Sequence, residues 1–215
     1  MRTSSLSSKR QESLANMKVR IKFKKSKAVR FISHLSLAKT LRQAVCRAGL
    51  PIAYSHGFNP HQKISFCHPL PLGMISDSEF ADLVLTEKIE ADEVKKKLNE
   101  KLPTGIEILE AKRVPLQSKS LTSLADTASY KIILSQEQLP IKTKTSNSAI
   151  KSLSYEDSPE PTLNIIVKIP GVKIKDVLSS LLGLDEQGVK LIEVKRTGMF
   201  AQRKEALIPL MDICV

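Results

Sequence analysis

The sequence predicts an α+β protein made of two ferredoxin-like halves with the element order βαββαβ, the second half truncated or irregular. Three observations lead to this fold class: short segments of alternating apolar residues typical of strands, longer segments with helical apolar spacing, and a weaker repeat of the series in the second half. We therefore expect a disordered tail over residues 1–16 and a basic domain over 17–114. A linker over 115–127 and a degenerate second domain over 128–215 would follow.

The first 16 residues are polar and serine-rich and show no apolar periodicity. This composition favours disorder, because it buries too little apolar surface to offset the entropy of ordering the chain. A start rich in arginine and serine also resembles an organelle transit peptide. Glu12 and the weak amphipathicity favour the disordered tail over the targeting peptide.

Residues 18–24 alternate strictly between basic and apolar side chains, which predicts a strand. One face would pack through Val19, Ile21 and Phe23. The opposite face would be a row of cations, formed by Lys18, Arg20, Lys22 and Lys24.

A helix is expected between Ser33, which would cap its first turn, and Gly49, which would end it. Its apolar stripe consists of Leu37, Leu41, Ala44, Val45 and Ala48. Lys39 and Arg42, three residues apart, would share the exposed side of this helix.

The other elements are assigned from shorter patterns. In the first half, residues 50–54 and 63–67 are expected to be extended, 80–86 and 106–114 to be strands, and 91–102 to be a helix ended by Pro103. In the second half we expect a strand over 130–134, a hairpin from 150–153 and 163–167, a helix over 174–182 and a strand over 189–195. The first helix of that half would have to lie within residues 136–148, which are polar and lysine-rich.

The positive charge is concentrated in one part of the chain. The formal net charge is +12, yet residues 14–75 contain no Asp or Glu. That stretch holds all four histidines and eleven basic residues: Lys18, Arg20, Lys22, Lys24, Lys25, Lys27, Arg30, Lys39, Arg42, Arg47 and Lys63. Repulsion among these positive charges does not help a chain to fold, so we expect a polyanionic partner that neutralises them. We expect this partner to be RNA, and nothing in the sequence points to DNA. The alternative is a solvated surface that serves solubility.

Residues 54–63 (YSHGFNPHQK) form the segment richest in binding groups. Gly57 and the Asn59–Pro60 step predict a tight, irregular loop, and loops on rigid supports commonly carry binding residues. Tyr54 and Phe58 would stack on bases in the manner of single-stranded RNA sites, or would be core side chains that hold the loop. The full set of predicted RNA-binding residues is Lys18, Arg20, Lys22, Lys24, Arg30, Lys39, Arg42, Arg47, Tyr54, His56, Phe58, Asn59, His61 and Lys63.

His34 lies at the expected start of a helix, where free backbone N–H groups favour an anion. It would contact a phosphate or act as a general base, since an imidazole titrates near neutral pH, or it would simply pack. These residues leave open a metal-independent endoribonuclease with His34 or His61 as the base. Lys63 or Arg30 would then steady the developing charge.

The sequence gives no sign of a cofactor, a metal site or a membrane span. Its three cysteines include no C-x-x-C pair, and no cysteine–histidine spacing resembles a zinc site. Neither G-x-x-x-x-G-K nor G-x-G-x-x-G occurs, and no apolar run approaches the roughly 20 residues that cross a bilayer. We expect a protein of the reducing cytoplasm, without a cofactor or metal of its own.

Several spaced motifs carry a resemblance to a known family. They are residues 30–35 (RFISHL), 47–55 (RAGLPIAYS), 57–61 (GFNPH) and 69–73 (PLPLG), followed by Ser76 and Glu79. Together they resemble the bacterial radical SAM-linked proteins, densely over residues 18–86 and faintly beyond 115. Members of that family are encoded beside, or fused behind, a radical S-adenosylmethionine enzyme. The resemblance implies an accessory module that works with such an enzyme in trans on RNA or the ribosome.

The chain departs from that family pattern at three places. Ser36 stands where an aspartate usually follows Ser-His-Leu, His56 replaces an acidic or amide residue, and Gln62 replaces a proline. The missing aspartate weakens any argument for shared acid–base chemistry. No C-x-x-x-C-x-x-C motif occurs, so an iron–sulfur cluster and S-adenosylmethionine would belong to the partner.

The expected function is therefore a non-catalytic adaptor that holds RNA for an enzyme acting in trans. The endoribonuclease described above is one alternative. The other is a protein-binding module whose basic face docks on an acidic patch of the radical SAM partner.

Overall fold

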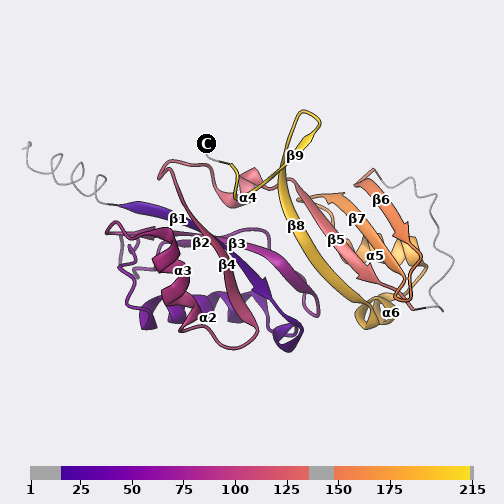
Figure 1. The fold of residues 1–215 in the computed structure, drawn as a ribbon, viewed down its shortest axis with the longest axis horizontal. Coiled ribbons are helices and arrows are strands. Elements are labelled where there is room, and N and C mark those ends of the chain that lie inside the picture. The colour runs from indigo at the N-terminus through magenta and orange to yellow at the C-terminus, as the bar shows by residue number, and fades with distance from the viewer. Residues whose placement is uncertain (1–15, 136–147, 214–215) are drawn as a thin grey trace, which may run out of the picture.

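The computed structural model describes residues 16–135 and 148–213, which form an α+β fold with one large mixed sheet and few helices (Figure 1). The strands are β1 (Met17–Lys25), β2 (Ile64–Phe66), β3 (Ile75–Leu85), β4 (Ile106–Val114), β5 (Thr127–Ile133), β6 (Ile150–Glu156), β7 (Thr162–Lys168), β8 (Glu193–Arg203) and β9 (Ala206–Pro209). The helices are α2 (His34–Arg47), α3 (Ala91–Asn99), α4 (Leu121–Leu124), α5 (Ile174–Leu182), α6 (Glu186–Leu191) and the 3-10 helix η1 (Lys27–Val29).

The sheet runs through both halves in the order β4-β1-β3-β8-β5-β7-β6, with β2 on β3 and β9 on β8. Within each half the pairs are antiparallel. The halves meet where the start of β3 runs parallel to β8, Ile75 opposite Lys195 and Ser76 opposite Arg196. The end of β3 pairs with β2 instead. One strand of the first half thus connects the two halves directly.

Most elements form where the pattern predicts them. Ser33 caps α2 by accepting a hydrogen bond from the Ser36 N–H at 3.1 Å, and Gly49 has the positive φ of 61° that commonly follows a helix. The strand over 106–114 and the helix over 174–182 have the expected bounds. Residues 50–54 contribute only two isolated bridges rather than a strand.

Four elements were not anticipated, and two expectations fall outside the described residues. The unanticipated ones are η1, α4, which lies within the segment 115–127, α6 and β9. The strand expected over 189–195 was wrong over 189–191, which belong to α6, and β8 begins only at Glu193. The α4 segment buries Leu121, Leu124 and Ala125, although its composition suggested a polar linker. The expected helix within 136–148 and the expected disordered tail over 1–16 fall almost entirely on residues outside the described ranges.

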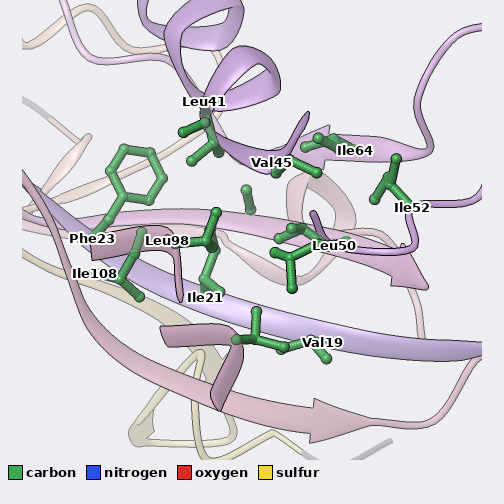
Figure 2. Close-up of a cluster of buried hydrophobic side chains, with 14 of the residues drawn as sticks. Val19, Ile21, Phe23, Leu41, Val45, Leu50, Ile52, Ile64, Leu98 and Ile108 are labelled. Carbon is green, nitrogen blue, oxygen red and sulfur yellow. The ribbon is translucent and has the colours of Figure 1, made fainter. Parts of the chain in front are cut away.

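The main core of the first half lies between the sheet and the helices α2 and α3 (Figure 2). The strand β1 contributes Val19, Ile21 and Phe23 as its alternation predicts, and α2 contributes Leu41 and Val45. A separate core around α5 holds the second half together. These packed layers fix the exposed face of α2.

The opposite face of the first-half sheet is also covered. Phe80 of β3 and Cys67 pack there against Leu121 of α4 and Leu210 from the segment that follows β9. The chain therefore folds its last described residues back over the strands of its first half. No helix in the described residues is both long and apolar enough to cross a membrane.

Candidate nucleic-acid interface

The helix α2 presents a basic exposed side because its buried positions are all apolar. Leu37, Ala38, Leu41, Ala44 and Val45 face the core. Lys39, Arg42 and Arg47 lie on the other side and are exposed. The helix contains no acidic residue, so no carboxylate within it offsets these charges. This result confirms the expected exposure of Lys39 and Arg42 and places Arg47 on the same side.

The loop over residues 54–63 is closed at its base by backbone hydrogen bonds. The Ser55 N–H donates to the His61 carbonyl at 2.8 Å, and the Lys63 N–H donates to the Ala53 carbonyl at 2.7 Å. The Ser55 hydroxyl accepts from the His61 N–H at 2.9 Å. Gly57, at φ 122°, takes the sharp turn that other residues rarely adopt. The loop therefore has a fixed base and an exposed tip.

Gln62 connects this loop to α2. Its side-chain amide donates to the Arg42 carbonyl at 3.3 Å and to the Cys46 sulfur at 2.9 Å. The Arg42 guanidinium in turn lies 5.8 Å from the centre of the Phe66 ring on β2. These contacts hold the loop beside the basic side of the helix.

Between the loop and α2 lies an open groove of about 800 Å³, which we call the α2 groove. The helix lines it with Lys39, Gln43, Arg47 and their neighbours Arg42 and Cys46, and the loop with Tyr54, Pro60, His61 and Gln62. None of these residues is acidic. Tyr54 lines the groove and is 48% exposed. The groove thus combines three cations with an aromatic ring, two amides and an imidazole.

The tip of the loop stands outside the groove lining. Phe58 is fully exposed, so the alternative reading of Phe58 as a core side chain is wrong. His56 and Asn59 are exposed beside it, whereas Lys63 is half-buried at the base. The structure thus brings Lys39, Arg42, Arg47, Tyr54 and His61 together in one groove and places the tip residues next to it.

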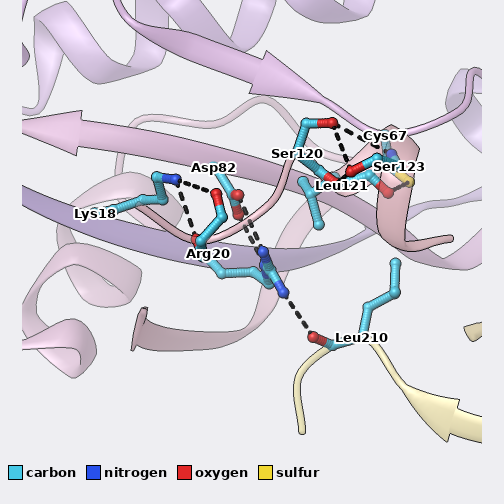
Figure 3. Close-up of polar contacts among 9 residues, drawn as sticks. Lys18, Arg20, Cys67, Asp82, Ser120, Leu121, Ser123 and Leu210 are labelled. Carbon is cyan, nitrogen blue, oxygen red and sulfur yellow. Dashed lines mark hydrogen bonds and ion pairs between the residues drawn. The ribbon is translucent and has the colours of Figure 1, made fainter. Parts of the chain in front are cut away.

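The expected row of cations on β1 does not exist as an exposed face. Arg20 is fully buried: its Nε donates to Asp82 Oδ1 at 2.8 Å, and its Nη1 donates to the Leu210 carbonyl at 2.9 Å (Figure 3). The cause is the cover formed by α4 and the segment after β9, which the alternation of β1 could not reveal. Arg20 is therefore not available as an RNA-binding residue in this structure.

The neighbours of Arg20 on the same face are also engaged. The Lys18 ammonium donates to the Ser118 carbonyl and hydroxyl, both at 3.1 Å (Figure 3). Lys22 forms an ion pair with Glu110 at 2.6 Å. Lys24 is half-buried and has no ion pair within the described ranges. Of these three lysines, only Lys22 forms an ion pair with a carboxylate among the described residues.

Arg30 and His34 lie near the start of α2, away from the groove lining. The Arg30 guanidinium stacks over the Phe31 ring at 4.7 Å. The His34 ring meets the Phe66 ring edge-on, with centroids 5.5 Å apart. Burial lowers the pKa of His34, partly opposed by Glu79. His34 therefore packs as a neutral ring near pH 7, and the groove contains His61 but not His34.

Gln43, Cys46 and Gln62 line the groove but were not among the predicted binding residues. Helical spacing holds the signal for the first two, since Gln43 follows Lys39 by four positions and Cys46 follows Arg42 by four. Gln62 carried no signal, because its role depends on the fold of the loop. Across residues 16–135 and 148–213, no group of three or more His, Cys, Asp or Glu side chains is placed to hold a metal ion.

Comparison with known protein families gives a match. Residues 18–197 match the family model DUF2344, described as an uncharacterized protein conserved in bacteria. The comparison with curated proteins gives no match. The matched range includes α2, the loop over 54–63 and all strands up to the first part of β8.

Proposed function

This chain belongs to DUF2344, a family of uncharacterized proteins conserved in bacteria, and we propose that it is a non-catalytic accessory protein that binds single-stranded RNA in the α2 groove. One observation carries the proposal. The groove gathers Lys39, Arg42 and Arg47 beside an exposed tyrosine, without an acidic residue in its lining. Single-stranded RNA needs this combination, because cations meet its phosphates and ring faces stack on its unpaired bases.

The groove cations form no ion pair with any described residue, unlike Arg20 and Lys22 on β1. Arg20 and Lys22 each have a carboxylate partner, so their charges contribute little to a surface potential. Within residues 16–135 and 148–213, Arg47 is the one groove cation with a side-chain hydrogen bond, and its acceptor is the neutral Lys101 carbonyl at 3.0 Å. A polyanion that binds here releases its own counterions without displacing a protein carboxylate.

The fold supports this assignment at a coarser level. We infer that each half derives from a ferredoxin-like unit. The strands of the first half lie in the order β4-β1-β3-β2, and those of the second half lie in the order β8-β5-β7-β6. In both halves the spatial order is therefore fourth, first, third and second strand of that half, as in a ferredoxin-like sheet. The α2 groove would then lie on the helical layer of the first unit, with the sheet as its rigid base.

We further propose that the RNA is presented to a radical SAM enzyme in trans. The support for this step is the resemblance of residues 30–35, 57–61 and 69–73 to radical SAM-linked proteins. The family description names no activity and no partner. The proposal that the α2 groove binds RNA does not depend on this step.

Fluorescence anisotropy with a labelled single-stranded RNA tests the proposal. The groove variant Lys39→Glu/Arg42→Glu/Arg47→Glu removes three phosphate contacts and should weaken binding by at least a hundredfold at low salt. Its slope of log affinity against log salt should be shallower by about 2, since each contact to a single strand contributes about 0.7.

The matched control is Lys112→Glu/Lys131→Glu/Lys168→Glu, which makes the same change in net charge at exposed strand positions away from the groove. This control should retain most of the affinity and the wild-type salt slope. If both triple variants lose affinity equally, binding follows net charge and the groove proposal is wrong. If wild-type protein does not bind RNA at low salt, the whole RNA proposal is wrong.

A further inference from the structure

A second cavity, of about 700 Å³, lies where the two halves meet. His68, Pro69 and Pro71 of the first half form one wall, and the start of α5 with the segment before it forms the other. Proline side chains and short turns keep their shape on binding, so these walls are largely preformed. The cavity does not share a lining residue with the α2 groove.

The floor of this cavity is polar and buried. Arg196 is 1% exposed and Tyr130 is 4% exposed, and both line the cavity. The Arg196 Nε donates to Glu79 Oε1 at 3.1 Å, and its Nη2 donates to the His68 carbonyl at 3.1 Å. Because Glu79 balances Arg196, the floor contributes hydrogen-bonding groups but little net charge.

The rim sets the sign of the charge. Lys173 and Lys175 line the cavity together with a single acid, Asp176, which leaves one positive charge in excess. The start of α5 adds to this preference, because its N-cap residue is Lys173, whose side chain makes no capping hydrogen bond to the first N–H groups of the helix. A ligand with one negative charge is the best electrostatic match.

An apolar slot of about 130 Å³ adjoins the cavity and shares Lys175 and Val189 with it. Its lining includes Phe31 and Leu72, which are 66% and 52% exposed. Large apolar side chains that stay exposed side by side often mark a binding surface. Except for Lys175, the slot is lined by apolar residues and Gly73.

We propose that the cavity and the slot together bind one small organic anion with an apolar body. Lys175, on the border of the two spaces, contacts the charged group of the ligand. The slot beside Leu72 takes up its apolar body, and the polar floor hydrogen-bonds to groups on the part that fills the cavity. Carboxylates, sulfonates and phosphate esters with a ring or a branched chain have this chemistry.

The probe for this test is 8-anilinonaphthalene-1-sulfonate, which joins one sulfonate to an apolar aromatic body and fluoresces when it leaves water. Wild-type protein should give a saturable increase in fluorescence that fits one site. Lys173→Glu/Lys175→Glu reverses the charge of the rim and should weaken binding by about tenfold or more, which corresponds to 1.4 kcal/mol or more. Leu72→Ser should weaken it by about fivefold, through loss of roughly 40 Å² of apolar contact.

Two controls make the result specific. Lys112→Glu, on β4, should bind the probe as the wild type does, and so should Arg42→Glu in the α2 groove. All changed positions are outside the buried core, and cooperative unfolding in urea shows that each variant is folded. Binding that does not saturate, or that the rim and slot variants leave unchanged, would overturn the proposal and show an adventitious dye contact only. The variant Lys173→Glu/Lys175→Glu should bind RNA as the wild type does, whether or not it binds the dye. A failure of the cavity proposal can therefore be distinguished from a failure of the RNA-binding proposal.

Discussion

Arg20 and Asp82 form a two-point ion pair across β1 and β3, with Nε to Oδ1 at 2.8 Å and Nη2 to Oδ2 at 3.1 Å, and both side chains are buried. Arg20→Ala would leave the Asp82 carboxylate buried without its partner. We expect the free energy of unfolding, measured in urea, to fall by about 3–5 kcal/mol. Lys24→Ala, on the same strand, should change it by less than about 0.5 kcal/mol. A stable Arg20→Ala protein would contradict the burial of this pair.

Replacement of both partners should cost less than replacement of one. Arg20→Met/Asp82→Leu removes both charges together and fills the space with apolar groups. Buried ion pairs replaced in this way are often neutral or stabilising, so the double variant should recover most of the stability lost in Arg20→Ala. The same urea unfolding experiment measures the difference. A double variant as unstable as the single one would show that the Leu210 carbonyl, left without its donor, dominates the cost.

Phe58 should matter for RNA binding and not for folding. Because its ring is fully exposed, Phe58→Ala should change the free energy of unfolding by less than about 0.5 kcal/mol. If the ring stacks on a base, the same variant should weaken RNA binding by about 1–3 kcal/mol in anisotropy titrations. Phe58→Tyr keeps the ring face and should bind as the wild type does. Equal affinity of the alanine variant would place the RNA away from the loop tip.

Alkylation of Cys46 reports directly on the α2 groove, because this exposed thiol lies in its lining. In a Cys214→Ser background, iodoacetamide at pH 8 should modify Cys46, and bound RNA should slow that reaction severalfold. Cys67 is the internal control: burial raises the pKa of its thiol to about 12, so it should stay unmodified in the folded protein. Mass spectrometry of peptides distinguishes the two sites. An unchanged Cys46 rate at saturating RNA would argue against the groove.

His34 should make stability depend on pH below neutrality. Burial lowers its pKa below the ordinary 6.5, so between the two values the unfolded chain binds a proton that the folded protein does not. Stability should therefore fall as the pH drops from 7 through 6.5, until the folded state also takes up the proton. His34→Gln should show a shallower decline in urea unfolding over this range. An identical slope would mean that His34 titrates normally in the folded protein.

Much of the fold followed from local patterns. The alternation of Val19, Ile21 and Phe23 predicted β1, and Ser33 and Gly49 marked the two ends of α2. These signals are enough to predict β1 and α2, because strand alternation and helix caps both depend on residues that are close together in the chain. The parallel contact of Ser76 with Arg196 has no such signal, since it joins residues more than a hundred positions apart.

In the candidate site too, local patterns predicted some residues correctly, whereas long-range contacts decided others. Lys39 and Arg42 were predicted correctly to be exposed, because helical spacing alone places them opposite a buried stripe. Arg20 was assigned to the surface by the alternation of its strand, a rule that holds only when one face of the sheet meets water. The cover formed by α4 and Leu210 removes that condition, and only a tertiary contact reveals it.

The hydrogen bond from Arg20 to the Leu210 carbonyl joins residues 190 positions apart. During translation β1 emerges early, whereas Leu210 is added only after nearly every other described residue has been made. Until then Arg20 lacks one of its hydrogen-bond acceptors, and the apolar surface around Phe80 lacks part of its cover. A ribosome that stalls before codon 210 would therefore hold an incompletely closed protein, open to chaperones and proteases on the face that the finished molecule hides.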